Sequence, residues 1–205
     1  MKDRLDLWAG EFGDSYHARN APTDASVMAR AAWFQEVFSN LREHPRKVLE
    51  VGCGCGANFA ALYRVDPGIQ AYGVEPNFNA RAQAFEQAPQ AHVFSGSADE
   101  IPGAVDSEFD LVMTCGVLIH IPNEGLPDAM GEIHRVAKRF ILCAEYYGRE
   151  VEGVPYRGED GALWRRPYGD LWMKQFPDLK PLAQGFAWKR TMGLDDLCWF
   201  LFEKP

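Results

Sequence analysis

The sequence predicts an α/β fold in which helices cover both faces of a mostly parallel sheet. Two observations predict it. Short apolar segments alternate with segments of helical periodicity from about residue 47 to residue 145, and a glycine-rich turn directly follows the first apolar segment. The 205 residues, 47% of them hydrophobic, are enough for one globular domain with a sizeable core.

Seven strands are predicted along the chain, at residues 47–51, 71–75, 91–95, 109–114, 140–145, 184–188 and 198–203. Helices are predicted before about residue 41, most clearly at residues 29–38, and at residues 58–64, 77–87 and 126–136, the last three between consecutive strands. A stretch punctuated by Gly and Pro runs from residue 146 to about residue 166, and a helix is expected near residues 168–176. The last two strands are expected to form a hairpin at one edge of the sheet, with the C-terminal strand antiparallel to the others.

The charge balance restricts the partners. Lys and Arg number 21 against 29 Asp and Glu, a formal net charge of −8, and such a surface repels phosphate backbones, so no nucleic-acid partner is expected. No apolar run approaches the roughly 18 residues of a membrane span, and the charged start lacks the apolar segment of a secretory signal. We therefore expect no membrane partner and a cytoplasmic protein whose five cysteines are free thiols. Cys53 and Cys55 have no second pair at zinc-like spacing, so no metal site is expected.

The strongest local signal is the turn after the first strand, where Gly52, Gly54 and Gly56 alternate with other residues. Glycines there let the chain leave a strand sharply and let a ligand approach bare backbone. The segment also satisfies the dinucleotide fingerprint, with Glu75 in the place of the ribose-binding acid. Three features favour S-adenosylmethionine over NAD: Glu50 inside the first strand, where a carboxylate can meet an amino group, the long segment ahead of that strand, and too short a remainder for a separate substrate domain.

Beyond this turn, the chain resembles class I S-adenosylmethionine-dependent methyltransferases over nearly its whole length. The segments that carry the resemblance are Glu50-x-Gly52-x-Gly54-x-Gly56, Tyr72-Gly73-Val74-Glu75, Ser97-Ala98-Asp99, and the fourth strand from Phe109 through Cys115-Gly116 to Ile121. The resemblance implies a Rossmann-like fold and a site for S-adenosylmethionine, with Glu75 on the ribose hydroxyls. The residues that it implies at the cofactor are Glu50, Gly52, Cys53, Gly54, Gly56, Glu75, Pro76, Ser97, Ala98, Cys115 and Gly116.

A narrower resemblance covers both ends of the chain. The segments 8–20, 144–147, 156–158, 163–166, 185–186 and 199–204 resemble the pseudaminic-acid-biosynthesis-associated methylases. This resemblance implies an N-terminal lid in which Tyr16, Arg19 and Asn20 close over the cofactor, with Arg19 gripping its carboxylate. Some S-adenosylmethionine-dependent azetidine-2-carboxylate synthases, which cyclise the cofactor's own aminobutyrate arm, look similar as well.

Four residues are candidates for the catalytic side of the site. His120 follows the fourth strand at the sheet edge where open α/β folds bind ligands; it suits a general base or a residue that only shapes the pocket. Tyr146 and Tyr147 end the fifth strand, where phenol rings can face a sulfonium or donate a hydrogen bond. Arg157, together with Arg165 and Arg166, is a candidate clamp for a carboxylate or phosphate, because guanidinium binds such groups bidentately.

The sequence therefore predicts one domain in four parts: an N-terminal helical lid (1–45), a cofactor-binding core (46–145), a substrate-binding insertion (146–183) and a C-terminal hairpin (184–205). The predicted activity is O- or N-methylation of an anionic small molecule, either a nonulosonate-type sugar or an amino-acid-like metabolite. Two alternatives stay open: cyclisation of S-adenosylmethionine to azetidine-2-carboxylate, and non-catalytic binding of it.

Overall fold

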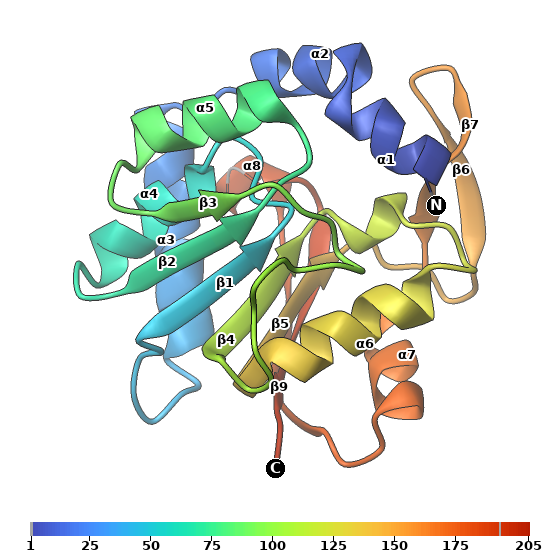
Figure 1. Ribbon diagram of the computed structural model, residues 1–205. Coiled ribbons are helices and arrows are strands. Elements are labelled where there is room, and N and C mark those ends of the chain that lie inside the picture. The colour runs from blue at the N-terminus through green and yellow to red at the C-terminus, as the bar shows by residue number, and fades with distance from the viewer. Residues whose placement is uncertain (1, 193) are drawn as a thin grey trace.

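A computed structural model describes residues 2–192 and 194–205 (Figure 1). Its strands are β1 (Lys47–Val51), β2 (Gln70–Val74), β3 (His92–Phe94), β4 (Phe109–Cys115), β5 (Ala137–Glu145), β6 (Glu152–Tyr156), β7 (Glu159–Arg165), β8 (Lys180–Ala187) and β9 (Leu197–Glu203). Its helices are α1 (Lys2–Ala9), α2 (Glu11–Arg19), α3 (Asp24–Phe38), α4 (Ala57–Val65), α5 (Phe78–Gln87), α6 (Leu126–Val136), α7 (Tyr168–Gln175) and α8 (Lys189–Met192), with a short 3-10 turn η1 (Leu118–His120).

Seven strands form one sheet in the order β3-β2-β1-β4-β5-β9-β8. The pairs from β3 to β5 are all parallel, whereas β9 runs antiparallel to both β5 and β8. The predicted mostly parallel seven-stranded sheet with an antiparallel C-terminal strand is therefore confirmed. The hairpin of the last two strands lies at the sheet edge as expected, with β9 one place in from the edge because β8 pairs along its outer side.

Two hydrophobic cores lie on opposite faces of the sheet, as the alternation of side chains along a strand requires. On β1, Val48 belongs to the core that contains Phe34 of α3, and the next residue, Leu49, belongs to the core that contains Ile133 of α6. Helix α4 contributes to the first core and α7 to the second. The prediction that helices cover both faces is therefore confirmed (Figure 1).

The carboxyl ends of the parallel strands face α1 and α2, which lie across the top of the molecule in Figure 1. Aromatic contacts tie these helices to the rest of the chain: the Trp8 ring lies 4.4 Å from the His120 ring, and the Phe12 ring 6.3 Å from Tyr156 of the β6–β7 hairpin. The N-terminal helices and this hairpin therefore enclose the sheet edge at which open α/β folds bind ligands.

Two segments differ from the sequence-based expectation. Helices were expected before about residue 41, most clearly at residues 29–38, and α1, α2 and α3 form there, but α3 begins earlier than residue 29 because Thr23 and Ser26 form a capping box. The stretch expected to be irregular up to residue 166 contains the antiparallel pair β6–β7, which turns at Arg157 and Gly158 with φ of 53° and 87°. Gly and Pro within these short strands hide their alternation.

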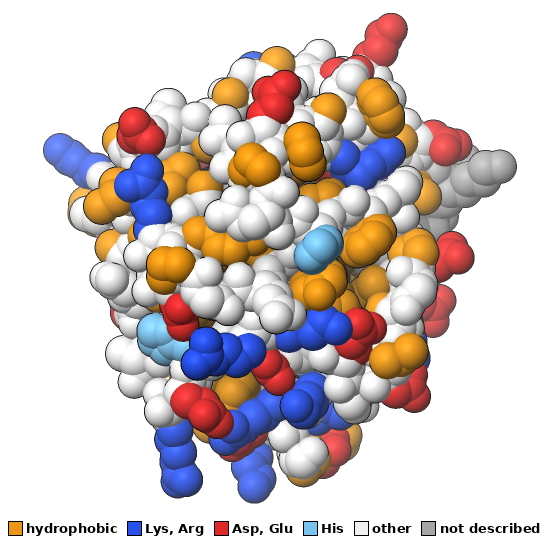
Figure 2. All heavy atoms as spheres, turned by 60° about the vertical axis from the view of Figure 1, so that its left-hand side comes forward, with side chains coloured by type: hydrophobic (Ala, Val, Ile, Leu, Met, Phe, Trp, Pro, Cys, Tyr) orange, Lys and Arg blue, Asp and Glu red, His pale blue; other side chains and the backbone are white. Residues whose placement is uncertain are grey.

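The surface seen in Figure 2 carries hydrophobic side chains in its upper half, and Lys and Arg interspersed with Asp and Glu below them. The exposed hydrophobic residues include Phe78 and Phe85 on α5 and Phe94 on β3. Throughout residues 2–192 and 194–205, no helix combines the length and the apolar character that a membrane span requires.

The packing of Gly73 gives a direct test of the fold. A Cβ atom on Gly73 would lie 2.6 Å from both Cys53 Sγ and Phe59 Cζ, whereas one on Gly131 of α6 would meet nothing within 4 Å. We expect Gly73→Ala to lower the free energy of unfolding by about 1–3 kcal/mol through overpacking, and Gly131→Ala to leave it unchanged or raise it by up to about 1 kcal/mol. Denaturant titration measures both, and equal effects of the two substitutions would contradict this packing.

Candidate active site

A cavity of about 210 Å³ lies at the carboxyl ends of β1, β2 and β4, under α1 and α2. The turn Gly52–Gly56 forms one wall, and all three of its glycines have positive φ. At Gly54 the backbone N–H donates to Glu75 Oε2 at 3.0 Å, and the His17 ring lies so close that an added Cβ would stand 3.2 Å from it. A side chain at this position would therefore be both strained and crowded.

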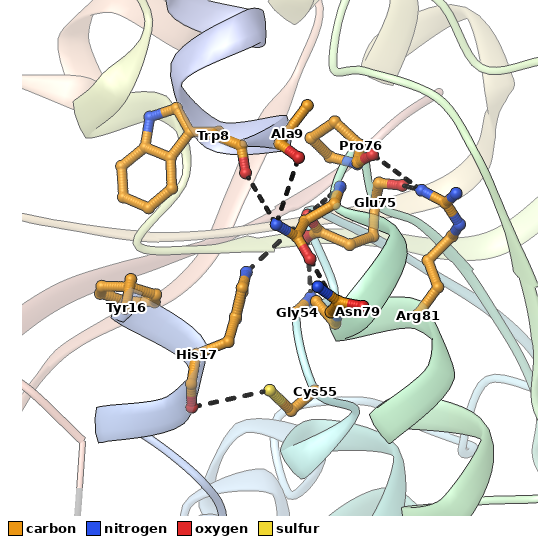
Figure 3. A network of polar contacts seen from close by, with 12 residues as sticks. Trp8, Ala9, Tyr16, His17, Gly54, Cys55, Glu75, Pro76, Asn79 and Arg81 are labelled. Carbon is orange, nitrogen blue, oxygen red and sulfur yellow. Dashed lines mark hydrogen bonds and ion pairs between the residues drawn. The ribbon is translucent and has the colours of Figure 1, made fainter. Parts of the chain in front are cut away.

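Glu75, directly after β2, is the acid of the second wall (Figure 3). It is 5% exposed; its Oε1 accepts the N–H of Asn77 at 2.9 Å, and its Oε2 accepts that of Gly54. Burial raises the pKa of this carboxyl, while the two N–H groups act in the opposite direction. Each carboxylate oxygen keeps a further lone pair, so Glu75 can still accept from hydroxyl groups of a ligand.

Glu50 on β1 is 2% exposed, and only one of its oxygens has a partner within the protein. Oε1 accepts from Asn58 Nδ2 at 2.5 Å, and Asn58 Oδ1 accepts from Arg30 Nη1 at 2.8 Å. Glu50 Oε2 and Arg30 Nε are both buried without a hydrogen-bond partner. Burial raises the pKa of Glu50 to about 8. Since unpaired buried polar groups are costly, this row of side chains favours a ligand that carries both a donor and an acceptor.

The loop after β4 is held from two sides. Glu145, fully buried at the end of β5, accepts the N–H groups of Val117, Leu118 and Ile119 at 3.2, 3.1 and 3.3 Å. Arg166, also fully buried, donates to the carbonyl oxygens of Leu118 and Ile121 at 2.9 and 2.7 Å and to the side chain of Asn123. A carboxylate on the N–H groups and a guanidinium on the carbonyl groups leave this loop little freedom.

His120 sits on that loop. Its Nδ1 lies 2.6 Å from the carbonyl oxygen of Ala162 on β7, and because a carbonyl oxygen only accepts, Nδ1 carries the proton and Nε2 keeps its lone pair. Burial lowers the pKa of His120 to about 4, so the ring is neutral near pH 7. His120 is therefore an oriented hydrogen-bond acceptor, and a weaker base than an exposed histidine.

The covering helices are attached by side chains at the start of α5. Asn77 Nδ2 donates to the carbonyl oxygen of Trp8 at 3.2 Å and to Asp14 Oδ1 at 2.8 Å, and Asn79 donates to the same carboxylate at 3.0 Å. His17, 7% exposed, places Nε2 3.9 Å from Glu75 Oε1 (Figure 3). The helices α1 and α2 thus screen the turn and Glu75 from solvent.

Most of the cofactor-binding residues implied by the resemblance line this cavity: Tyr16, Asn20, Glu50, Gly52, Cys53, Gly54, Glu75, Pro76, Ser97, Ala98, Cys115 and Gly116. Gly56 does not line it but caps α4 in the left-handed conformation, and Arg19 is exposed at the end of α2, outside the lining. Among the catalytic candidates, His120 lines this cavity and a smaller neighbour, and Tyr146 lines the neighbour. Tyr147, 48% exposed, and Arg157, also exposed, line neither.

Several cavity residues were not expected from the sequence, among them Trp8, His17, Arg30 and Asn58. Arg30 matters most, because it is a cation in the cavity lining, whereas Arg19, which was expected to bind a carboxylate there, is not part of the lining. A signal for it was present: it is a charged residue within the otherwise apolar segment from Val27 to Phe34 of α3. Charged residues in such segments are rarely buried unless they are paired.

Residues 48–139 match the model of a family described as a methyltransferase domain. A comparison with curated protein sequences gave no significant match.

Solved structures share the fold. A magnesium protoporphyrin IX methyltransferase from Synechocystis PCC 6803 with bound S-adenosylmethionine is 13% identical with a TM-score of 0.70, over 98% of this chain and 95% of that one. A 1,6-didemethyltoxoflavin N1-methyltransferase from Burkholderia thailandensis is 15% identical with a TM-score of 0.73, over 99% and 89%. An S-adenosylmethionine-dependent methyltransferase from Thermotoga maritima is 17% identical with a TM-score of 0.64, over 98% and 100%.

At such low identity these likenesses establish the fold, and the family match adds the methyltransferase domain. The predicted fold is confirmed, and over residues 48–139 the chain matches a methyltransferase domain, in agreement with the predicted S-adenosylmethionine-dependent methyltransferase. The narrower resemblance to the pseudaminic-acid-associated methylases, the methyl acceptor and the roles of individual residues stay predictions.

The burial of Glu50 makes stability depend on pH. Its folded-state pKa of about 8 lies above that of an exposed Glu, so between these values the folded protein holds a proton that the unfolded chain has lost. The contribution of Glu50 to the free energy of unfolding therefore falls as pH rises through this window. We expect Glu50→Gln to match the wild type near pH 4 and to be more stable by roughly 2–4 kcal/mol near pH 8.

Denaturant titration at both pH values measures this difference, with Glu86→Gln on the exposed side of α5 as the matched control. The control should follow the wild type at both values. A Glu50→Gln variant that is less stable than the wild type near pH 8 would show that the carboxylate is held ionised.

Proposed function

We propose that the protein transfers a methyl group from S-adenosylmethionine to a small molecule bound beside His120. The observation that carries the proposal is the pair of unpartnered buried atoms, Glu50 Oε2 and Arg30 Nε, in a cavity that also presents the glycine turn and Glu75. An α-amino acid group carries an ammonium ion that can donate to Glu50 and a carboxylate that can accept from Arg30. A dinucleotide has no ammonium group for Glu50.

Each part of the cofactor has a fitting set of residues. Glu75 would accept from the ribose hydroxyls, and Ser97 and Ala98 would border the adenine ring, as the resemblance implies. Glu50 would bind the amino group and Arg30 the carboxylate, because guanidinium and carboxylate pair in a bidentate way. Arg19, which was predicted to grip the carboxylate, is not needed for it. When bound, S-adenosylmethionine supplies an electrophilic methyl group on a positively charged sulfur.

The chain's own residues then orient the acceptor and exclude water. The loop held by Glu145 and Arg166 fixes His120, whose Nε2 would accept a hydrogen bond from the acceptor. Trp8 and Tyr16, whose rings lie 5.3 Å apart, cover this side of the cavity from α1 and α2. Such positioning supplies up to roughly 7–11 kcal/mol in well-oriented systems, so no strong base is required.

The anionic acceptor has weaker support than the methyl transfer itself. That expectation rested on a clamp by Arg157, Arg165 and Arg166. Arg157 is exposed beside Tyr156, Arg165 is half-exposed 3.9 Å from Glu152, and Arg166 is occupied by backbone carbonyl groups. None of these three arginines is therefore placed to pair with the carboxylate of a nonulosonate-type sugar acid in the cavity.

Cyclisation of S-adenosylmethionine is the second candidate, and two observations favour it. First, the arginines that had indicated a separate anionic substrate do not line the cavity. Second, the raised pKa of Glu50 makes this side chain less selective for a charged amine, and cyclisation needs the neutral amine. The fold and the methyltransferase domain nevertheless favour transfer, which stays our first proposal.

Product analysis separates the two. We expect protein incubated with S-adenosylmethionine alone to leave it intact, and S-adenosylhomocysteine to form once a metabolite extract is supplied. Glu75→Ala should weaken cofactor binding by about 1.5–3 kcal/mol and slow turnover accordingly. Methylthioadenosine and azetidine-2-carboxylate formed from S-adenosylmethionine alone, faster than with Glu75→Ala, would overturn transfer in favour of cyclisation.

A further inference from the structure

A second, smaller cavity of about 70 Å³ adjoins the proposed cofactor cavity. The two share five lining residues: Tyr16, Arg30, Cys115, Gly116 and His120. The remaining walls of this small cavity come from the end of β5, the β6–β7 hairpin and the segment before β9. It therefore lies where an acceptor would meet the methionine part of the cofactor.

Three phenol rings line the small cavity: Tyr16 on α2, Tyr146 after β5 and Tyr156 on β6. Burial raises the pKa of Tyr16 and of Tyr146, so both stay neutral phenols. The face of an aromatic ring carries partial negative charge and attracts cations, as it does at Tyr156, whose ring centre lies 5.6 Å from the Arg157 guanidinium, so such rings favour a cationic group over an anionic one.

Two polar groups of the small cavity, Asp195 and His120, are acceptors. Asp195 accepts from Tyr146 Oη at 2.6 Å and from Lys189 Nζ at 2.7 Å, and each of its oxygens retains a lone pair. His120 adds the lone pair of Nε2, since its Nδ1 is bonded to Ala162. Both groups suit a ligand that donates N–H, and both oppose a carboxylate or phosphate.

Arg30 is the one cation in the lining, as far as the described residues go. Its Nη1 is bonded to Asn58, which lines the larger cavity and not the small one. If Arg30 binds the cofactor carboxylate, as proposed above, the small cavity keeps three rings, a carboxylate and a neutral histidine. Asp195 and the lone pair of His120 would accept from an amine and oppose an anion, to which only phenol hydroxyls could then donate.

We propose that the small cavity receives the amino group of the methyl acceptor, so that the enzyme methylates a small amine at nitrogen. The inference rests on the proposed function and specifies its acceptor; an amino-acid-like metabolite satisfies it and a sugar hydroxyl does not. The amine enters as an ammonium ion and releases one proton to water. The nitrogen lone pair then forms the bond to the methyl carbon as the sulfur–carbon bond breaks, which leaves a neutral thioether and a methylated ammonium product.

Three probes of the same ring and different charge test the cavity: benzylamine, benzyl alcohol and benzoate. Calorimetry on protein saturated with S-adenosylhomocysteine should give benzylamine an affinity about tenfold or more above that of the other two, the range expected for a desolvated cation on aromatic rings. Asp195→Asn should lower the benzylamine affinity about fivefold or more and leave that of benzyl alcohol unchanged. Asp178→Asn, an exposed acid before β8, should change neither.

A second variant tests the same cavity if Asp195→Asn fails to fold. If Asp195→Asn unfolds, Tyr156→Leu must lower benzylamine affinity more than benzyl alcohol affinity, because it removes one ring and no charge. Benzoate bound as tightly as benzylamine, equal binding of the three probes, or no binding of any probe would overturn the inference. Benzylamine selectivity without any turnover of S-adenosylmethionine would end the proposed function and leave the amine site standing.

Discussion

Three buried acidic side chains at the carboxyl edge of the sheet determine the architecture of this site. Glu50 on β1, Glu75 after β2 and Glu145 at the end of β5 are all at most 5% exposed. Charged or polar groups so far from water are stable only when donors surround them. The parallel order of these strands brings the three acids to one edge, so the loops at that edge must supply the donors.

Two of the acids are satisfied by backbone, and this shapes the loops. Glu75 accepts from Gly54 and Asn77 and so joins the glycine turn to the start of α5, while Glu145 gathers three N–H groups of the loop that carries His120. Glu50 is different: a single side-chain amide serves it, and Oε2 has no partner. The incomplete acid and the incomplete guanidinium of Arg30 are both bonded to Asn58, and the amino acid group of the proposed cofactor would complete both.

Much of the fold followed from local sequence, and much of the site did not. The strands of the parallel sheet are apolar runs bounded by turn residues, and the glycines after β1 mark the turn that we propose binds the cofactor without any tertiary information. Arg30 and Asn58, by contrast, meet across 28 positions of sequence, and Arg166 reaches carbonyl groups more than 40 positions away. Such pairs depend on how helices pack, which periodicity does not reveal.

The same limit explains the arginine clamp. Arg157 carries the positive φ of the hairpin turn and is directed to solvent, whereas the buried Arg166 is taken up by the loop beneath it. The arginines of the predicted insertion therefore indicated an anionic ligand, although Arg157 belongs to a turn and Arg166 holds a loop. The acidic residues at the strand ends of the sheet edge predicted the position of the candidate site better than these arginines did.

The proton balance of cofactor binding tests the central role of Glu50 most directly. In the free protein the pKa of Glu50 is raised to about 8, so the carboxyl is mostly protonated near pH 7, and an ammonium group bound beside it should make it ionise. Calorimetry of S-adenosylhomocysteine binding near pH 7, in two buffers of different ionisation enthalpy, should report the release of about one proton by the wild type and none by Glu50→Gln. Binding with no proton release by the wild type, or with the same release by both proteins, would contradict the account.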